Sequence, residues 1–147
     1  MAEVVLNHEV SALGLAGQIV VDSAGTAAEV GWEIDRRARR ALERRGYKPL
    51  DHRARQFEPA WLNQRDLVIA MERRHVRWLE SHAPTPAYTA SVRLLLSFPT
   101  GQEEPGNCPE IADPYLGGES DFESCLDLVQ AGCAALLGEL VSELALD

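Results

Sequence analysis

The chain has 147 residues, of which 46% are hydrophobic and 25% are charged, a composition typical of one globular domain. Its net charge of −9 argues against a protein that binds nucleic acid by neutralising phosphates. The sequence has neither the basic and apolar start of a secretion signal nor a run of about 18 apolar residues. We therefore expect a cytoplasmic protein with no nucleic-acid partner and no membrane partner.

The charges are distributed unevenly. Residues 1–93 hold all 14 Lys and Arg and 12 acids, whereas residues 94–147 hold 11 acids and no base. Such an arrangement could prepare a site for an anionic substrate, but most of these charges are interpreted as solvated helix faces. The three cysteines, Cys108, Cys125 and Cys133, are expected to be free thiols of a reducing compartment.

The first half of the chain predicts a strand between two helices. Helical spacing of apolar residues over about 2–13 indicates a helix. Residues 18–23 (QIVVDS) form an apolar, β-branched run that indicates a buried strand leading into a turn at Gly25. Asp35 can cap a second helix that extends to about Arg45 and stops at Gly46, with Ala38, Ala41 and Leu42 facing inward.

The second half continues the alternation. Residues 66–71 (DLVIAM) predict a strand, 72–82 a helix and 91–98 (SVRLLLSF) a third strand. A loop rich in Gly, Pro and acids over 99–118 precedes a long amphipathic helix that begins near Phe122. Strands separated by helices predict a single α/β domain, with three α/β/α layers and a parallel sheet. Such sheets bind ligands beyond the carboxyl ends of their strands.

Several short motifs occur in one order along nearly the whole chain. They are Met1-Ala2-Glu3, residues 21–26 (VDSAGT), Gly46-Tyr47, residues 52–56 (HRARQ), residues 66–71 (DLVIAM), residues 92–95 (VRLL) and Asp113-Pro114-Tyr115. Each motif alone is weak evidence. In this order and at these spacings, the set resembles the low-molecular-weight protein-tyrosine phosphatases.

The resemblance implies a four-stranded parallel sheet and hydrolysis of phosphotyrosine through a cysteinyl-phosphate, with no metal and no cofactor. In the family a loop of Cys, any five residues, Arg, Ser and Pro lies between the first strand and the first helix, and its amides and Arg bind the phosphate. Here Met1-Ala2-Glu3 matches the residues that follow that loop, and the first cysteine, Cys108, comes after the last arginine, Arg93. We expect residues 1–147 to be one N-terminally truncated domain that lacks the first strand, is inactive and self-associates through exposed sheet edges.

The resemblance also assigns roles to residues that remain in the chain. Asp113 matches the general acid that protonates the leaving tyrosyl oxygen and then acts as a base on water. Tyr115 would stack on the ring of a phosphotyrosine protein or an aryl phosphate. Ser23 and His52 match positions that support the phosphate loop from beneath. Trp32 either forms a wall of the substrate pocket or packs into the protein, and packing is slightly preferred.

Three functional hypotheses follow. The first is a phosphotyrosine phosphatase whose true start lies upstream of Met1. The second is a catalytically dead relative that binds phosphoproteins or pairs with a partner. The third, an arsenate reductase, is least supported, because its relay thiols would be expected within residues 71–90, which contain no cysteine.

Overall fold

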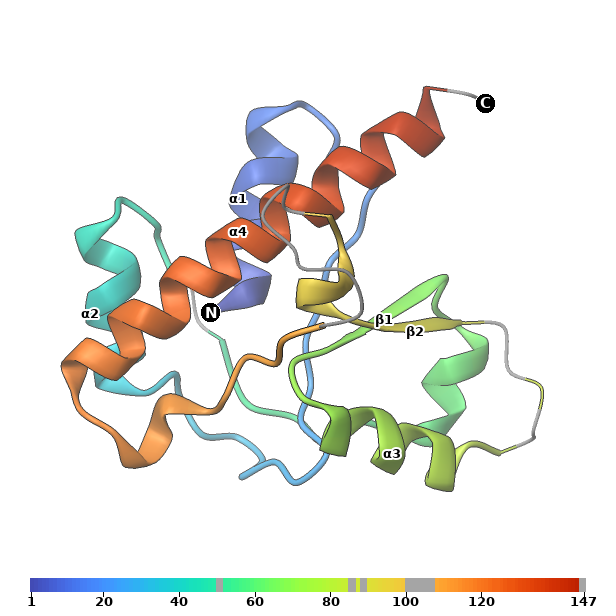
Figure 1. The fold of residues 1–147 in the computed structure, drawn as a ribbon, viewed down its shortest axis with the longest axis horizontal. Coiled ribbons are helices and arrows are strands. Elements are labelled where there is room, and N and C mark those ends of the chain that lie inside the picture. Colours follow the sequence, from blue (N-terminus) through green and yellow to red (C-terminus); the bar gives the residue numbers. More distant parts are fainter. Residues whose placement is uncertain (50–51, 85–86, 88–89, 100–107, 146–147) are drawn as a thin grey trace.

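The computed structural model describes residues 1–49, 52–84, 87, 90–99 and 108–145 (Figure 1). Within these residues lie the helices α1 (Ala2–Ala12), α2 (Arg36–Arg44), α3 (Arg73–His82) and α4 (Glu119–Leu144). The described strands are β1 (Leu67–Ala70) and β2 (Ser91–Leu94), and the short 3-10 helices are η1 (Pro59–Asn63), η2 (Leu95–Ser97) and η3 (Pro114–Leu116). All four predicted helices are confirmed, with ends that differ from the prediction by a few residues.

The strands β1 and β2 are parallel and in register from the Leu67 and Ser91 pair to the Ala70 and Leu94 pair. The helix α3 connects them, because two parallel strands cannot be joined by a tight turn. Side chains alternate across β1, so Leu67 and Ile69 pack on the main core whereas Val68 packs on the cluster beside α3. The chain is therefore a single α/β domain with a parallel sheet between helical layers, as predicted.

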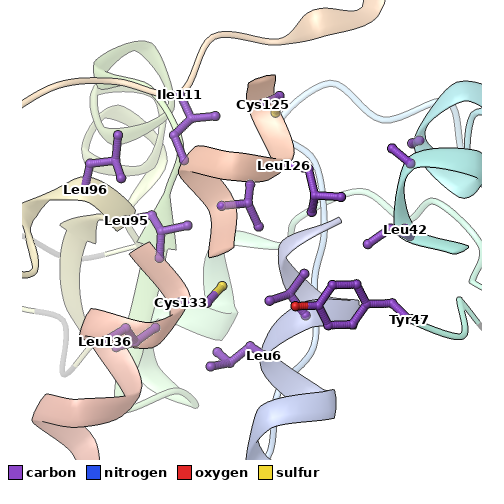
Figure 2. Close-up of a cluster of buried hydrophobic side chains, with 14 of the residues drawn as sticks. Leu6, Leu42, Tyr47, Leu95, Leu96, Ile111, Cys125, Leu126, Cys133 and Leu136 are labelled. Carbon is purple, nitrogen blue, oxygen red and sulfur yellow. The ribbon is translucent and has the colours of Figure 1, made fainter. Parts of the chain in front are cut away.

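The main core lies between α1, α4, α2 and η2 (Figure 2). Val5 and Val10 of α1 and Leu126 and Leu136 of α4 are each at most 2% exposed. At Gly132, a Cβ atom would lie 2.6 Å from Cγ of Leu95, so a larger residue at this position would separate α4 from η2. The three cysteines are free, as predicted.

The limits of α2 follow the sequence signals. The Asp35 carboxylate accepts a hydrogen bond of 2.7 Å from the Arg37 amide and so satisfies one of the helix's unpaired donors. Gly46 has φ of +83°, a conformation that side chains disfavour, and the chain turns there. The inward face predicted for this helix is confirmed, with Ala38, Ala41 and Leu42 buried.

The prediction of a strand over residues 18–23 is wrong. Among the described residues this segment has no strand ladder, only an isolated bridge between Gly25 and Gln56 just beyond it, and Val20 is 91% exposed. Apolar β-branched residues favour an extended backbone, but a strand also needs a neighbouring backbone to pair with. No strand lies alongside this segment in the part of the chain that the structure describes.

The third predicted strand is shorter than expected, and part of the predicted loop after it is helical. Leu95 and Leu96 turn into η2, because both side chains are buried in the same core and a strand would place them on opposite faces. Of the predicted loop over 99–118, residues 100–107 lie outside the described residues, and residues 114–116 form η3.

The helix charges where α2 meets α4 are exposed to solvent, as predicted, but they also form ion pairs that the sequence did not predict. Arg44 donates hydrogen bonds of 2.9 Å to Glu119 and to Glu123, and Arg45 contacts Glu123 at 2.9 Å and Asp127 at 2.6 Å. Single exposed pairs contribute little to stability, but this set is a network that joins two helices. At this contact, arginines of the basic front thus pair with acids of the tail.

By length and composition, α4 is the one helix in the described ranges that could cross a membrane, with a mean hydropathy of 1.4 over its most apolar window. This finding differs from the sequence-based expectation that the chain has no segment able to span a membrane. Leu126, Val129 and Leu137 are buried in the core, however, and a core helix has the same composition. The hydropathy of α4 is therefore weak evidence for a membrane segment.

Candidate active site

Asp113 lies where a parallel sheet of this kind binds ligands. The backbone amide of Ile111 donates a hydrogen bond of 2.9 Å to the carbonyl of Met71, so this segment is attached just beyond the carboxyl end of β1. Asp113 then caps η3, because its carboxylate accepts a hydrogen bond of 3.0 Å from the Tyr115 amide, and Pro114 starts the helix. The Asp113 side chain is held in one orientation and is still exposed to solvent.

A hollow of about 320 Å³ lies beside Asp113. Its walls come from residues 110–114 and from the first turns of α4, including Asp121, Cys125 and Leu128. This volume is at the lower end of the range for small-molecule sites. In the described part of the chain, no group of His, Cys, Asp and Glu residues could hold a metal ion.

The Cys125 thiol lies between this hollow and the beginning of α1. Burial raises the pKa of Cys125, and the negative charge of Asp113 raises it further, whereas the Met1 ammonium group opposes the increase. Burial raises the pKa of Cys133 to about 12. Both thiols are therefore protonated at neutral pH and are poor nucleophiles.

Ser23 and His52 meet at a residue that the sequence analysis did not single out. The Ser23 hydroxyl donates a hydrogen bond to a carboxylate oxygen of Glu3, and Nδ1 of His52 lies 3.2 Å from the same oxygen. Glu3 is in the first turn of α1, where the helix dipole favours a negative charge. Its presence in the Met1-Ala2-Glu3 motif was the available sequence signal. The two predicted support residues are thus brought together at the start of α1.

The two predicted substrate-binding aromatic residues are both on the surface. Tyr115 is 55% exposed, and its ring lies 5.6 Å from the guanidinium of Arg37. Trp32 is 60% exposed, so the preferred interpretation that it packs into the protein is wrong. Neither side chain lines the hollow beside Asp113. Their role in substrate binding stays a prediction.

Solved structures define the class of protein to which this fold belongs. A crystal structure of a protein tyrosine phosphatase from Entamoeba histolytica, with Hepes in its active site, matches with a TM-score of 0.82 at 25% identity and covers 97% of this chain and 88% of that one. The structure of YfkJ from Bacillus subtilis has the same TM-score at 27% identity and covers 97% of this chain and 86% of that one. The fold is that of the small tyrosine phosphatases.

Sequence comparison identifies the family within this class. The sequence profile described as Low molecular weight phosphotyrosine protein phosphatase matches residues 1–146. A low molecular weight protein-tyrosine-phosphatase of Streptomyces coelicolor is 40% identical over 141 residues, which cover 93% of this chain and 82% of the relative. The human low molecular weight phosphotyrosine protein phosphatase is 30% identical over 139 residues, with 93% and 84% covered. The chain belongs to the low molecular weight phosphotyrosine protein phosphatase family, and the predicted resemblance is confirmed.

Proposed function

We propose that this chain serves the hydrolysis of phosphotyrosine in proteins, or of an aryl phosphate, with Asp113 as the general acid and then the general base. The observation that carries the proposal is the placement of Asp113, which is exposed, accepts a hydrogen bond from the Tyr115 amide and lines a hollow beyond the carboxyl end of β1. The side chains of Ser23 and His52 meet at Glu3 in the first turn of α1, which supports their role beneath a phosphate loop.

The reaction takes place in two steps. A cysteine thiolate attacks phosphorus, the bond between phosphorus and the tyrosyl oxygen breaks, and Asp113 donates its proton to the leaving oxygen. Asp113 is then a carboxylate, and it removes a proton from the water that attacks the cysteinyl-phosphate. Inorganic phosphate and the free thiolate are formed.

The printed sequence contains no Cys followed six residues later by Arg, because Arg93 is the last arginine and Cys108 the first cysteine. Cys125 lies next to the hollow, but its raised pKa keeps it protonated. We therefore propose that a polypeptide of only these 147 residues has no nucleophile and releases no phosphate. Asp113 can act as general acid and base only when a Cys-x5-Arg loop precedes the first turn of α1.

The experiment compares two proteins. One is the printed chain, and the other is an extended chain in which a strand and a Cys-x5-Arg-Ser-Pro loop precede Met1. With phosphotyrosine as substrate, we expect no phosphate release by the printed chain and measurable turnover by the extended chain. Asp113→Asn in the extended chain should lower kcat by about 10²–10⁴-fold. Asp127→Asn, an exposed acid of α4, is the control and should leave kcat unchanged.

Three results would contradict the proposal. Turnover by the printed chain that depends on Asp113 would show that it holds a nucleophile after all. Full activity of the extended chain with Asp113→Asn would show that Asp113 is neither the general acid nor the general base. An extended chain that folds and remains inactive would favour the alternative, a catalytically dead relative that binds phosphoproteins, for which exposed Tyr115 and Trp32 supply aromatic surface. The arsenate-reductase alternative needs reactive relay thiols, whereas Cys125 and Cys133 have raised pKa values.

A further inference from the structure

We infer that Arg37 is a positioning residue for the segment that carries Asp113, an inference that rests on the proposed function. Arg37 belongs to α2, far in sequence from that segment, and no motif in the sequence pointed to it. Its guanidinium reaches across to η3 and fixes the backbone on both sides of Leu116.

The Arg37 guanidinium contacts η3 and its surroundings in two ways, through hydrogen bonds and through cation–π contacts with aromatic rings. One nitrogen, Nη1, donates a hydrogen bond of 2.7 Å to the Gly117 carbonyl, and Nη2 donates one of 3.0 Å to the Tyr115 carbonyl. The guanidinium carbon lies 4.5 Å from the centroid of the Phe122 ring and 5.6 Å from that of Tyr115. Phe122 is buried in α4, so Arg37 links η3 to the core.

Arg37 is itself held in place by Asp35. The Asp35 carboxylate accepts hydrogen bonds from Nε of Arg37 at 3.1 Å and from Nη2 at 2.9 Å, and it also caps α2 through the Arg37 amide. These bonds to Arg37 hold the pKa of Asp35 below its usual range. The side chain is therefore fixed at its own end before it reaches η3, which lowers the entropy cost of its contacts there.

The connection from Arg37 to the general acid is short. The Tyr115 carbonyl accepts from Arg37, and the amide of the same residue donates to the Asp113 carboxylate. Loss of the guanidinium frees the Tyr115 and Gly117 carbonyls and lets η3 move, and the orientation of the Asp113 carboxylate is then less well defined. A general acid displaced by about 1 Å can lose about 100-fold in rate.

The first test uses the printed chain and needs no activity. Chymotrypsin can cut after Tyr115 and after Leu116, which is 97% exposed, but only when η3 opens. Arg37→Ala should increase the rate of these two cuts by about tenfold, whereas cuts after the buried Phe122 stay slow. Arg37→Lys should also increase it, because an ammonium group lacks the two parallel donors of a guanidinium.

The matched control is Arg40→Ala. Arg40 is on the same helix and bonds Glu119 at 2.9 Å, so this variant loses an ion pair with α4 but no contact with η3. It should leave the two cuts at the native rate. The inference is overturned if Arg40→Ala accelerates them as much as Arg37→Ala, if neither Arg37 variant changes them, or if cuts after Phe122 rise in parallel, which would show loss of the whole fold.

The second test separates positioning from a merely structural role in the active, extended chain. A misplaced acid slows the release of a basic phenol more than that of an acidic one, because only the basic phenol needs its proton early. Arg37→Ala should lower kcat for phosphotyrosine about tenfold and should change kcat for p-nitrophenyl phosphate and the KM of either substrate much less. An equal loss for both substrates would overturn the inference. An inactive extended chain with the native residue at position 37 would instead contradict the proposed function, and the proteolysis would still decide the role of Arg37.

Discussion

The core between α1 and α4 and the segment that carries Asp113 are held by different forces. In the core, side chains such as Leu126 are fully buried and are stabilised by packing. In the segment from Cys108 to Gly118, the Asp113 and Tyr115 side chains are exposed. Hydrogen bonds fix the chain there: the Ile111 amide donates to the Met71 carbonyl, and Arg37 donates to the Tyr115 carbonyl. A proton donor must remain in contact with solvent and substrate, so it cannot be stabilised by burial. The comparison predicts that stability and catalysis respond to different substitutions.

The largest effect on stability is expected in the core. Leu126→Ala should lower the free energy of unfolding by about 3 kcal/mol, because it leaves a cavity that α1 and α2 cannot fill. Leu128→Ala, on the same helix but 43% exposed, is the matched control and should cost less than about 0.5 kcal/mol. Urea denaturation of both variants measures the difference. Equal losses of unfolding free energy in the two variants would contradict the claim that stability comes from the core and not from the residues around the hollow beside Asp113.

A smaller effect is expected where α4 touches η2. Gly132→Ala brings a methyl group against Leu95 and should destabilise the protein by about 1–3 kcal/mol. Gly138→Ala, at a helix position with nothing within 4 Å of the added atom, should instead stabilise it by about 0.5–1 kcal/mol. Thermal unfolding should therefore move in opposite directions in the two variants. A stabilised Gly132→Ala protein would show that this close approach is absent.

The ion pairs between α2 and α4 should make stability depend on pH. Hydrogen bonds from Arg44 hold the pKa values of Glu119 and Glu123 below their usual range. Their contribution is therefore present above the unfolded value of about 4.3 and is lost as the pH falls through the lower folded values. Arg44→Gln should lower Tm slightly at pH 7 and should have no effect near pH 2. Arg36→Gln, without an ion pair among the described residues, should have no effect at either pH, and a loss that persists at low pH would contradict this account.

The smallest effect concerns association. Residues 18–24 have no strand partner in the described part of the chain, and Val20 is 91% exposed, so we predict that the printed chain self-associates through unpaired backbone groups. Val20→Lys should shift the chain toward the monomer, because a charge on an unpaired edge opposes pairing. Sedimentation velocity over a range of concentrations measures this shift. A native chain that is monomeric throughout would contradict the prediction.

Local signals in the sequence predicted the helices well. The apolar periodicity, the Asp35 cap and Gly46 all lie in or next to the helix that they define, so no distant partner has to be known to predict it. Residues 18–23 could not be predicted in the same way, because pairing of a strand depends on a distant neighbour. The strand likewise ends at Leu95 because the side chains of Leu95 and Leu96 are both buried in the same core, which a strand would not allow.

The candidate site shows the same division. Asp113, Ser23 and His52 were predicted as site residues because motifs occur in a fixed order along the sequence, and their roles stay predictions. The contacts of Glu3 and Arg37 could not be predicted, because they are tertiary: Arg37 and the Gly117 carbonyl are 80 residues apart. The pairing of α2 arginines with α4 acids was missed for the same reason, since the sequence shows charges but not which helices touch.

The most direct measurement of the central claim is the dependence of kcat on the phenol in the extended chain. A series of aryl phosphates whose phenols span a range of pKa values should give nearly constant kcat when Asp113 protonates the leaving oxygen. With Asp113→Asn, kcat should fall steeply as the phenol becomes more basic. The same shallow dependence in both proteins would show that the proton comes from elsewhere and that Asp113 is an ordinary helix cap.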